Sequence, residues 1–152
     1  MTRPLTSGKP AARTIECEAI VRRPPEVVFD FLAELDNHWL IAGRRLVSRR
    51  QPLPGGAVRV KFGPPGVRRW AISRIERAER PRLLEGTART ARSEGTTRWL
   101  LEPAGDGATR VRFVQELRPR PLDDRLLVAL AAPWLRGQYR RALDRLSRTL
   151  EN

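Results

Sequence analysis

The chain is poor in the residues that most enzymes and metal proteins use: it has one cysteine and one histidine among 152 residues. Cys17 cannot form an internal disulfide, and nucleophile–base pairs usually need a histidine, of which there is only His38. One Cys and one His far apart in sequence cannot complete a three- or four-ligand metal site without several carboxylates, and the acidic residues show no suggestive spacing. The pair Gly55 and Gly56 precedes a strand pattern and not a helix, so it is no phosphate-binding loop. We therefore expect no metal, no cofactor and no catalytic residue of a recognisable motif.

Long hydrophobic runs are also absent, and no stretch approaches the length needed to span a membrane. Residues 1–13 contain Pro4, Gly8 and Pro10 and lack the apolar core of a signal peptide. We expect a disordered basic leader over 1–13, a single domain over 14–152, and a cytoplasmic protein without membrane insertion. The oligomeric state is left open.

Acidic residues are scarce relative to basic ones: 17 against 30, for a formal charge of +13. All basic residues except Lys9 and Lys61 are arginines, which suggests the coding bias of a GC-rich genome. That bias does not explain the shortage of acids, so an anionic partner such as nucleic acid or an acidic protein is one interpretation. The other is a solvated cationic surface, because the arginines are spread along the chain. Either way we expect weak, salt-sensitive binding to polyanions without sequence preference.

Most of the chain has the period-2 pattern of antiparallel strands. Ile15 to Val21 predicts the first strand, and Pro24 to Leu32 a short helix, followed by a second helical turn with Trp39. Further strands are expected over 46–51, 58–62, 68–77, 82–90, 97–102 and 110–115, with a break at Gly95. A five-residue loop after Phe62 would place Trp70 and Ile72 on the face of Val58 and Val60.

The clearest local signal is the hairpin around Gly105-Asp106-Gly107. If Asp106 is the centre, Trp99 lies opposite Phe113 and Leu101 opposite Val111. Glu102 then lies opposite Arg110 on the other face of the hairpin, a favourable charge pair. The hairpin therefore has one apolar, aromatic face and one solvent-exposed, basic face.

The last segment, Leu122 to Leu150, predicts a long amphipathic helix opened by Asp123 and Asp124. Its apolar residues form two stripes rotated by roughly 100° from each other, with Pro133 at their junction, so we expect a kink or break there. The first stripe contains Leu127, Leu130, Ala131 and Trp134, and the second contains Leu135, Tyr139, Ala142, Leu146 and Leu150.

This order of elements resembles the START-like, or SRPBCC, superfamily, which includes polyketide cyclase/dehydrase and lipid-transport proteins. The resemblance covers 14–150 and is carried by Pro24 to Leu32 with Trp39, by Ile75 to Leu83, by the hairpin 101–113 and by the terminal helix. It implies an α+β helix-grip fold: two short helices after the first strand, and a curved antiparallel sheet of six or seven strands wrapped around the C-terminal helix. It also implies a hydrophobic cavity between sheet and helix.

Three functions are consistent with such a cavity and surface. The first is binding or carriage of a small hydrophobic molecule, aromatic, polyketide-like or lipid-like. The second is a polyketide cyclase/dehydrase-like enzyme, for which Gln115, Tyr139, Glu85 and Arg98 are the only polar candidates, so we lean against catalysis. The third is an adaptor that binds nucleic acid or an acidic partner through its basic surface. The expected ligand-binding residues are Trp70, Ile72, Trp99, Leu101, Phe113, Gln115, Leu127, Leu130, Trp134 and Tyr139.

Overall fold

The computed structural model describes residues 13–91, 93–119 and 122–152. Of the expected leader over 1–13, residues 1–12 lie outside the described part, and Arg13 is already the first residue of a strand. The helices are α1 (Pro25–Ala33), α2 (Leu35–Ala42) and α3 (Leu122–Glu151), with a short 3-10 turn η1 (Pro54–Gly56). The strands are β1 (Arg13–Val21), β2 (Val47–Pro52), β3 (Val58–Phe62), β4 (Arg69–Glu79), β5 (Leu83–Arg89), β6 (Ser93–Pro103) and β7 (Thr109–Pro119).

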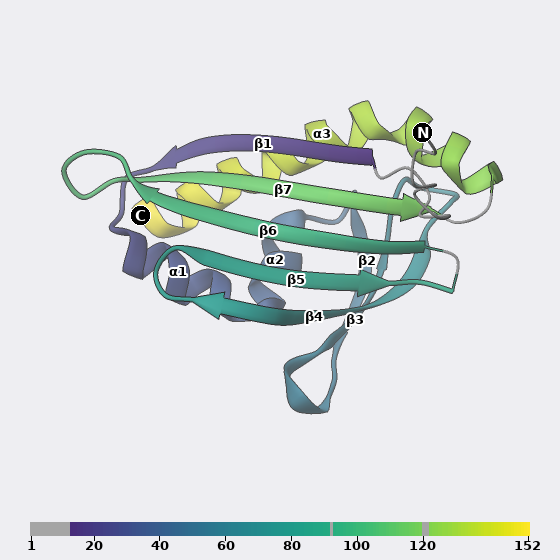
Figure 1. Ribbon diagram of the computed structural model, residues 1–152, viewed down its shortest axis with the longest axis horizontal. Coiled ribbons are helices and arrows are strands. Elements are labelled where there is room, and N and C mark those ends of the chain that lie inside the picture. The colour runs from purple at the N-terminus through teal and green to yellow at the C-terminus, as the bar shows by residue number, and fades with distance from the viewer. Residues whose placement is uncertain (1–12, 92, 120–121) are drawn as a thin grey trace, which may run out of the picture.

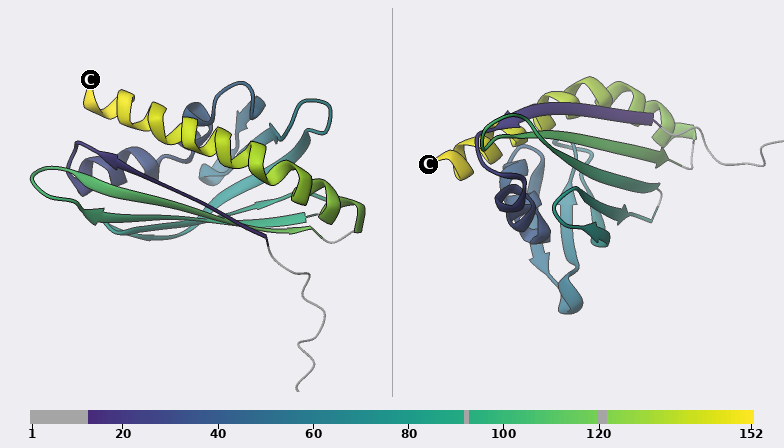
Figure 2. Two further views of the ribbon diagram at one scale, coloured as in Figure 1. Left: turned by 90° about the horizontal axis from the view of Figure 1, so that it is seen from above. Right: turned by 60° about the vertical axis from the view of Figure 1, so that its left-hand side comes forward.

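The strands form one antiparallel sheet of seven strands in the order β1-β7-β6-β5-β4-β3-β2 (Figure 1). Every neighbouring pair except β1–β7 is consecutive in the chain, so short turns connect most of the sheet. Figure 2 shows the sheet curving around α3, with α1 and α2 on the same side. The predicted helix-grip architecture is confirmed.

The inner face of the sheet follows from the alternation in the strands. In the final hairpin Trp99 pairs with Phe113, Leu101 with Val111, and Glu102 with Arg110, as predicted. Gly95 does not end β6, because it pairs with Ala88 and Leu117 inside the sheet. The expectation of a break there is wrong.

The end of the β3–β4 hairpin differs from the prediction. Phe62 pairs with Arg69, so the connecting loop has one more residue than the five expected. A one-residue slip in register moves every side chain of a strand to the opposite face. Trp70 and Ile72 therefore lie on the outer face with Arg59 and Lys61, and Ile72 is 43% exposed.

Helix α3 is held to the sheet by the second of its two apolar stripes. Leu135, Tyr139 and Leu146 are buried in the main hydrophobic core, whereas Leu130 is 72% exposed. At 100° per residue Leu130 points about 140° away from Leu135, so both cannot face the sheet. Of the kink or break expected at Pro133, the break is wrong, because one helix continues through this residue. The side chains of Asp123 and Asp124 lie outside the described part of the structure.

This burial predicts unequal effects of the same substitution on one helix. Leu146→Ala should lower the free energy of unfolding by about 3 kcal/mol, because it removes a side chain with no exposed surface and leaves a cavity. Leu130→Ala should change it by less than about 0.5 kcal/mol. Urea unfolding of both variants checks this; similar losses would show that the first stripe is also packed.

Candidate functional site: a hollow between the sheet and the C-terminal helix

A hollow exists inside the fold because small residues occupy neighbouring inner positions on three strands. Ser73 on β4 pairs with Ala88 on β5, and Gly86 on β5 pairs with Thr97 on β6. Ala142 of α3 also borders the hollow. Larger side chains at other inner positions fill the interior, whereas these small side chains leave a space between the sheet and α3.

Gly86 cannot carry a larger side chain in this backbone. A Cβ atom built there would lie 2.7 Å from the carbonyl oxygen of Arg74, closer than real Cβ contacts allow. A β-bulge between Ile75 and Arg77 interrupts the register beside this approach. The bulge and the glycine together leave space on the inner face of the sheet between β4 and β5, because no side chain stands at Gly86.

The resulting cavity has a volume of about 70 Å³ and is partly open to solvent. An engineered cavity that binds benzene has about 150 Å³. The expectation of a cavity large enough for an aromatic or lipid-like molecule is therefore not met in this conformation, and such a ligand requires lining side chains to move. The residues that border the cavity are Leu35, His38, Trp39, Ile41, Ala42, Leu46, Phe62, Ser73, Arg74, Ile75, Leu84, Glu85, Gly86, Thr87, Ala88, Thr97, Trp99, Phe113, Gln115, Tyr139 and Ala142.

Aromatic rings form a continuous wall of this cavity. Trp99 packs edge-on against Phe113 with ring centroids 4.7 Å apart, and Phe113 against Tyr139 at 4.9 Å. His38 adds a fourth ring, 5.4 Å from Trp99. Edge-to-face packing is a favourable arrangement of aromatic rings, so these contacts stabilise the wall.

The polar groups at the same wall are neutral. The Tyr139 hydroxyl donates a hydrogen bond to Oε1 of Gln115, and Thr97 pairs with Gln115 on the neighbouring strand. Burial raises the pKa of Tyr139 well above its usual range, so the phenol stays protonated. Nε1 of Trp99 is buried and donates to no acceptor among the described residues. This part of the cavity therefore offers hydrogen-bond groups without charge.

His38 is fixed by a hydrogen bond to the carbonyl oxygen of Leu32, 2.5 Å from Nε2. A carbonyl can only accept, so Nε2 carries the proton and Nδ1 keeps a lone pair. Burial lowers the pKa of His38 to about 4, against the smaller opposing effect of the hydrogen bond. The imidazole is therefore neutral at physiological pH.

The two half-buried rings Trp39 and Phe62 stand at another side of the cavity, with centroids 6.0 Å apart. Trp39 is held to β4 by a hydrogen bond from Nε1 to Oγ of Ser73, at 3.0 Å. Ser73 in turn donates to the carbonyl oxygen of Val58, at 3.3 Å. This chain of bonds ties α2 to the sheet where the cavity lies.

Of the ten predicted ligand-binding residues, four border the cavity: Trp99, Phe113, Gln115 and Tyr139. Leu101 is part of the core and Trp134 packs against the core, but neither residue borders the cavity. Leu127 is half-buried, and Leu130 points to solvent. Trp70 and Ile72 lie on the outer face because of the register at the β3–β4 hairpin.

Sequence reasoning missed the small residues and the α2 side of the cavity. Ser73, Gly86, Ala88 and Thr97 carried a usable signal, since small residues recur at inner positions of adjacent strands. His38 was not among the expected ligand-binding residues, yet its half-buried ring borders the cavity. Of Glu85 and Arg98, considered as polar cavity groups, Glu85 borders the cavity and Arg98 does not, and the two side chains pair with each other at 3.2 Å.

Within the described residues, no cluster of three or more His, Cys, Asp or Glu side chains could hold a metal ion. No helix in the same part of the chain is long and apolar enough to cross a bilayer. Cys17 is a free, buried thiol of the core.

Known proteins share both the sequence pattern and the architecture of this chain. The family model described as "Polyketide cyclase / dehydrase and lipid transport" matches residues 12–151. The chain belongs to this family. No curated protein has a matching sequence.

Solved structures share the fold at low sequence identity. The protein TTHA0849 from Thermus thermophilus superposes with a TM-score of 0.74 at 16% identity, over 91% of this chain and 97% of that one. Norcoclaurine synthase from Thalictrum flavum, in complex with dopamine and hydroxybenzaldehyde, gives 0.70 at 11% identity, over 98% and 96%. Ara h 8.0201 gives 0.57 at 16% identity, over 90% and 98%. These structural neighbours establish the fold.

The depressed pKa of His38 predicts a pH-dependent stability. The unfolded chain takes up a proton near pH 6.5, but the folded protein does so only near 4, so stability falls as the pH drops from 6.5 towards 4. The full shift corresponds to roughly 3 kcal/mol; since the residue keeps some contact with solvent, we expect a loss of about 1–2 kcal/mol.

The measurement is urea unfolding at several pH values for the wild type and His38→Gln. Because the paired carboxylates titrate in both proteins, the difference between the two curves isolates His38. A difference that does not change across this window would contradict the assignment of a buried, neutral imidazole.

Proposed function

We propose that the protein binds a small hydrophobic molecule, with at least one aromatic ring, in the cavity between the sheet and α3. The observation that carries this proposal is the wall of Trp99, Phe113, Tyr139 and His38 around a space that small residues keep empty. Apolar area removed from water supplies most of the affinity, roughly 25 cal/mol per Å². The family's association with hydrophobic molecules agrees with this choice.

The ligand is neutral and carries an oxygen that accepts hydrogen bonds. Leaving the buried Nε1–H of Trp99 unpaired costs about 1–3 kcal/mol, which a carbonyl or hydroxyl oxygen of a ligand would partly recover. Gln115 and Tyr139 orient the ligand from the adjoining wall. A charged ligand would have to leave water without a buried counter-charge, so it binds weakly.

Binding requires the cavity to expand. Trp39 and Phe62 are half-buried aromatic residues at its border, and outward rotation of these rings would enlarge it. The Trp39–Ser73 hydrogen bond opposes this rotation and sets part of its cost.

An enzyme of the cyclase/dehydrase type is the second candidate, because Gln115 and Tyr139 meet at one point of the cavity. Norcoclaurine synthase, a structural neighbour, was solved with dopamine and hydroxybenzaldehyde bound. Efficient general acid–base catalysis favours a group with a pKa near the working pH. The pKa of Tyr139 is shifted upward and that of His38 downward from that range, so we favour binding or carriage over catalysis.

We also propose that the protein acts in the cytoplasm, where a free thiol such as Cys17 stays reduced.

Filling the cavity should weaken ligand binding. Ala88→Leu places a larger side chain in a space of about 70 Å³, so the affinity for the neutral probe N-phenyl-1-naphthylamine should fall at least about ten-fold. Titration followed by quenching of tryptophan fluorescence measures it, since Trp99 and Trp39 border the cavity.

Ala33→Leu is the matched control, because Ala33 is exposed near the end of α1. It should bind the probe like the wild type. Trp134→Ala should also retain binding, since Trp134 does not border the cavity. Equal affinity of wild type and Ala88→Leu, with both folded by circular dichroism, would show that the probe binds elsewhere and the proposal fails.

A further inference from the structure

The positive charge is not evenly distributed along the chain. Residues 37–75, from α2 to the middle of β4, contain no Asp or Glu. Their basic residues are Arg44, Arg45, Arg49, Arg50, Arg59, Lys61, Arg68, Arg69 and Arg74. The sequence-based view of evenly spread arginines overlooked this segment.

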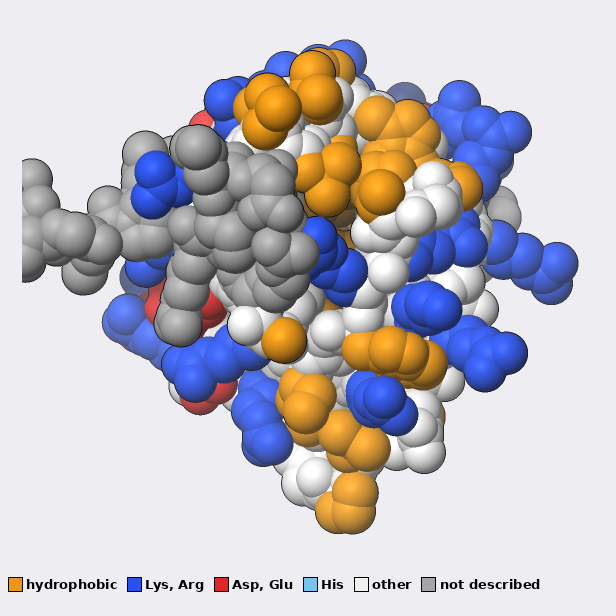
Figure 3. All heavy atoms as spheres, turned by 90° about the vertical axis from the view of Figure 1, so that its right-hand side faces the viewer, with side chains coloured by type: hydrophobic (Ala, Val, Ile, Leu, Met, Phe, Trp, Pro, Cys, Tyr) orange, Lys and Arg blue, Asp and Glu red, His pale blue; other side chains and the backbone are white. Residues whose placement is uncertain are grey.

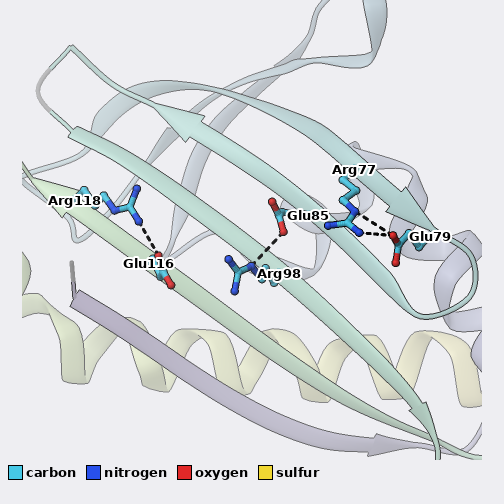
Figure 4. A network of polar contacts seen from close by, with 6 residues as sticks. All are labelled: Arg77, Glu79, Glu85, Arg98, Glu116 and Arg118. Carbon is cyan, nitrogen blue, oxygen red and sulfur yellow. Dashed lines mark hydrogen bonds and ion pairs between the residues drawn. The ribbon is translucent and has the colours of Figure 1, made fainter. Parts of the chain in front are cut away.

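Elsewhere on the sheet, arginines are paired with acids. On the outer face Arg112 pairs with Glu16, Arg110 lies 3.3 Å from Glu18, and Arg98 lies 3.2 Å from Glu85. Figure 4 shows the Arg98–Glu85 pair together with Arg118–Glu116 and Arg77–Glu79. This half of the outer surface is therefore close to neutral.

The acid-free segment forms the other end of the sheet. By register Arg49 on β2 lies beside Lys61 on β3, and Lys61 lies beside Trp70 on β4. Arg50 reaches an acid just outside the segment, Asp36 at 3.6 Å. On the side of the molecule drawn in Figure 3, Lys and Arg side chains lie in both halves, whereas most of the visible Asp and Glu side chains lie in one of them. We call the surface formed by residues 44–74 the cationic edge.

Exposed apolar side chains lie among these cations. Val67, at the tip of the β3–β4 hairpin, is 40% exposed and follows Pro65 and Gly66, which are exposed too. Arg68 fixes the hairpin to the loop after α2 through a hydrogen bond to the carbonyl oxygen of Arg45, at 2.9 Å, and it also bonds within the hairpin to the carbonyl oxygen of Gly63, at 3.2 Å. The hairpin therefore has an exposed apolar residue at its tip, with Arg45 and Arg68 at its base.

One further contact shows how the apolar and basic groups are combined on the cationic edge. The guanidinium of Arg59 stacks over the ring of Trp70, 4.0 Å from its centroid. An aromatic ring beside a cation suits the boundary between lipid headgroups and acyl chains. Ile72, on the same outer face, adds an exposed aliphatic side chain.

We propose that the cationic edge docks on the surface of an anionic lipid bilayer. The arginines contact phosphate and carboxylate headgroups, and the Val67 tip rests at the boundary with the acyl chains. Nucleic acid shares the phosphate chemistry, but the one aromatic ring named on this surface, Trp70, is already stacked by Arg59, and the exposed aliphatic side chains of Val67 and Ile72 neither stack on bases nor donate hydrogen bonds. The docking surface adjoins the cavity, because Leu46 and Phe62 border the cavity next to Arg45 and Gly63. It does not depend on what the cavity binds.

Sedimentation of the full chain with lipid vesicles tests this proposal. The protein should bind vesicles of mixed phosphatidylcholine and phosphatidylserine, and salt should weaken the binding. Pure phosphatidylcholine vesicles should not retain it. Each arginine near an anionic surface contributes about a five-fold gain, so the triple variant Arg44→Gln/Arg45→Gln/Arg49→Gln should bind on the order of 100-fold more weakly.

Two matched controls separate docking from net charge and general hydrophobicity. Arg22→Gln/Arg141→Gln/Arg148→Gln removes the same charge from exposed positions outside the cationic edge and should bind within about two-fold of wild type. Val67→Ser should weaken binding several-fold, whereas Ile20→Ser, at an exposed position on β1, should not.

Equal losses in the two triple variants would overturn the proposal, as would binding to single-stranded oligonucleotide that is tighter than to vesicles and insensitive to Val67→Ser. Failure to bind anionic vesicles would do so as well. In the absence of vesicles, N-phenyl-1-naphthylamine should still quench the tryptophan fluorescence of the triple cationic-edge variant. Loss of membrane docking is therefore distinguished from loss of ligand binding in the cavity.

Discussion

The structure depends on one packing constraint: a single helix face must cover the concave side of a strongly curved sheet. Leu135, Tyr139 and Leu146 of α3 meet Ile15 and Val111 of the sheet in the main core. Because α3 turns one face to the sheet, residues on the opposite side, such as Leu130, stay in solvent. The sheet curves around the face that it covers. Large side chains at the inner positions of the strands fill the space between sheet and helix, and small side chains leave part of it empty. The cavity is the place where Ser73, Gly86, Ala88 and Thr97 leave it empty.

The inner and outer surfaces of the sheet differ in chemistry because a strand alternates its side chains. The inner surface is apolar and aromatic, with neutral hydrogen-bonding groups at Gln115 and Tyr139. The outer surface is charged: paired with acids over β1, β7 and β6, and without acids over β2 and β3. A neutral ligand and an anionic surface would therefore be recognised by opposite sides of one sheet. Neither interaction has to disturb the other.

Local pattern was enough to predict much of this arrangement. The Gly105-Asp106-Gly107 turn predicted the register that sets Trp99 opposite Phe113, since turn geometry and alternation agreed. Trp70 and Ile72 were misplaced because the loop after Phe62 has one more residue than expected, and proline and glycine do not reveal loop length. Leu130 was misassigned because two apolar stripes competed for one helix, and only tertiary packing decides which is buried. The volume of the cavity and the environment of His38 depend on residues brought together from distant segments, which local periodicity cannot show.

The most direct test of the central claim is to locate a bound aromatic molecule. In a nuclear Overhauser experiment on the isotope-labelled protein with unlabelled naphthalene, the ligand protons should contact the methyl groups of Ala88 and Ala142, which border the cavity. The methyl groups of Leu130, exposed on α3, should show no contact. Contacts at Leu130 without contacts at Ala88 and Ala142 would place the ligand on the surface and contradict the account of an internal site.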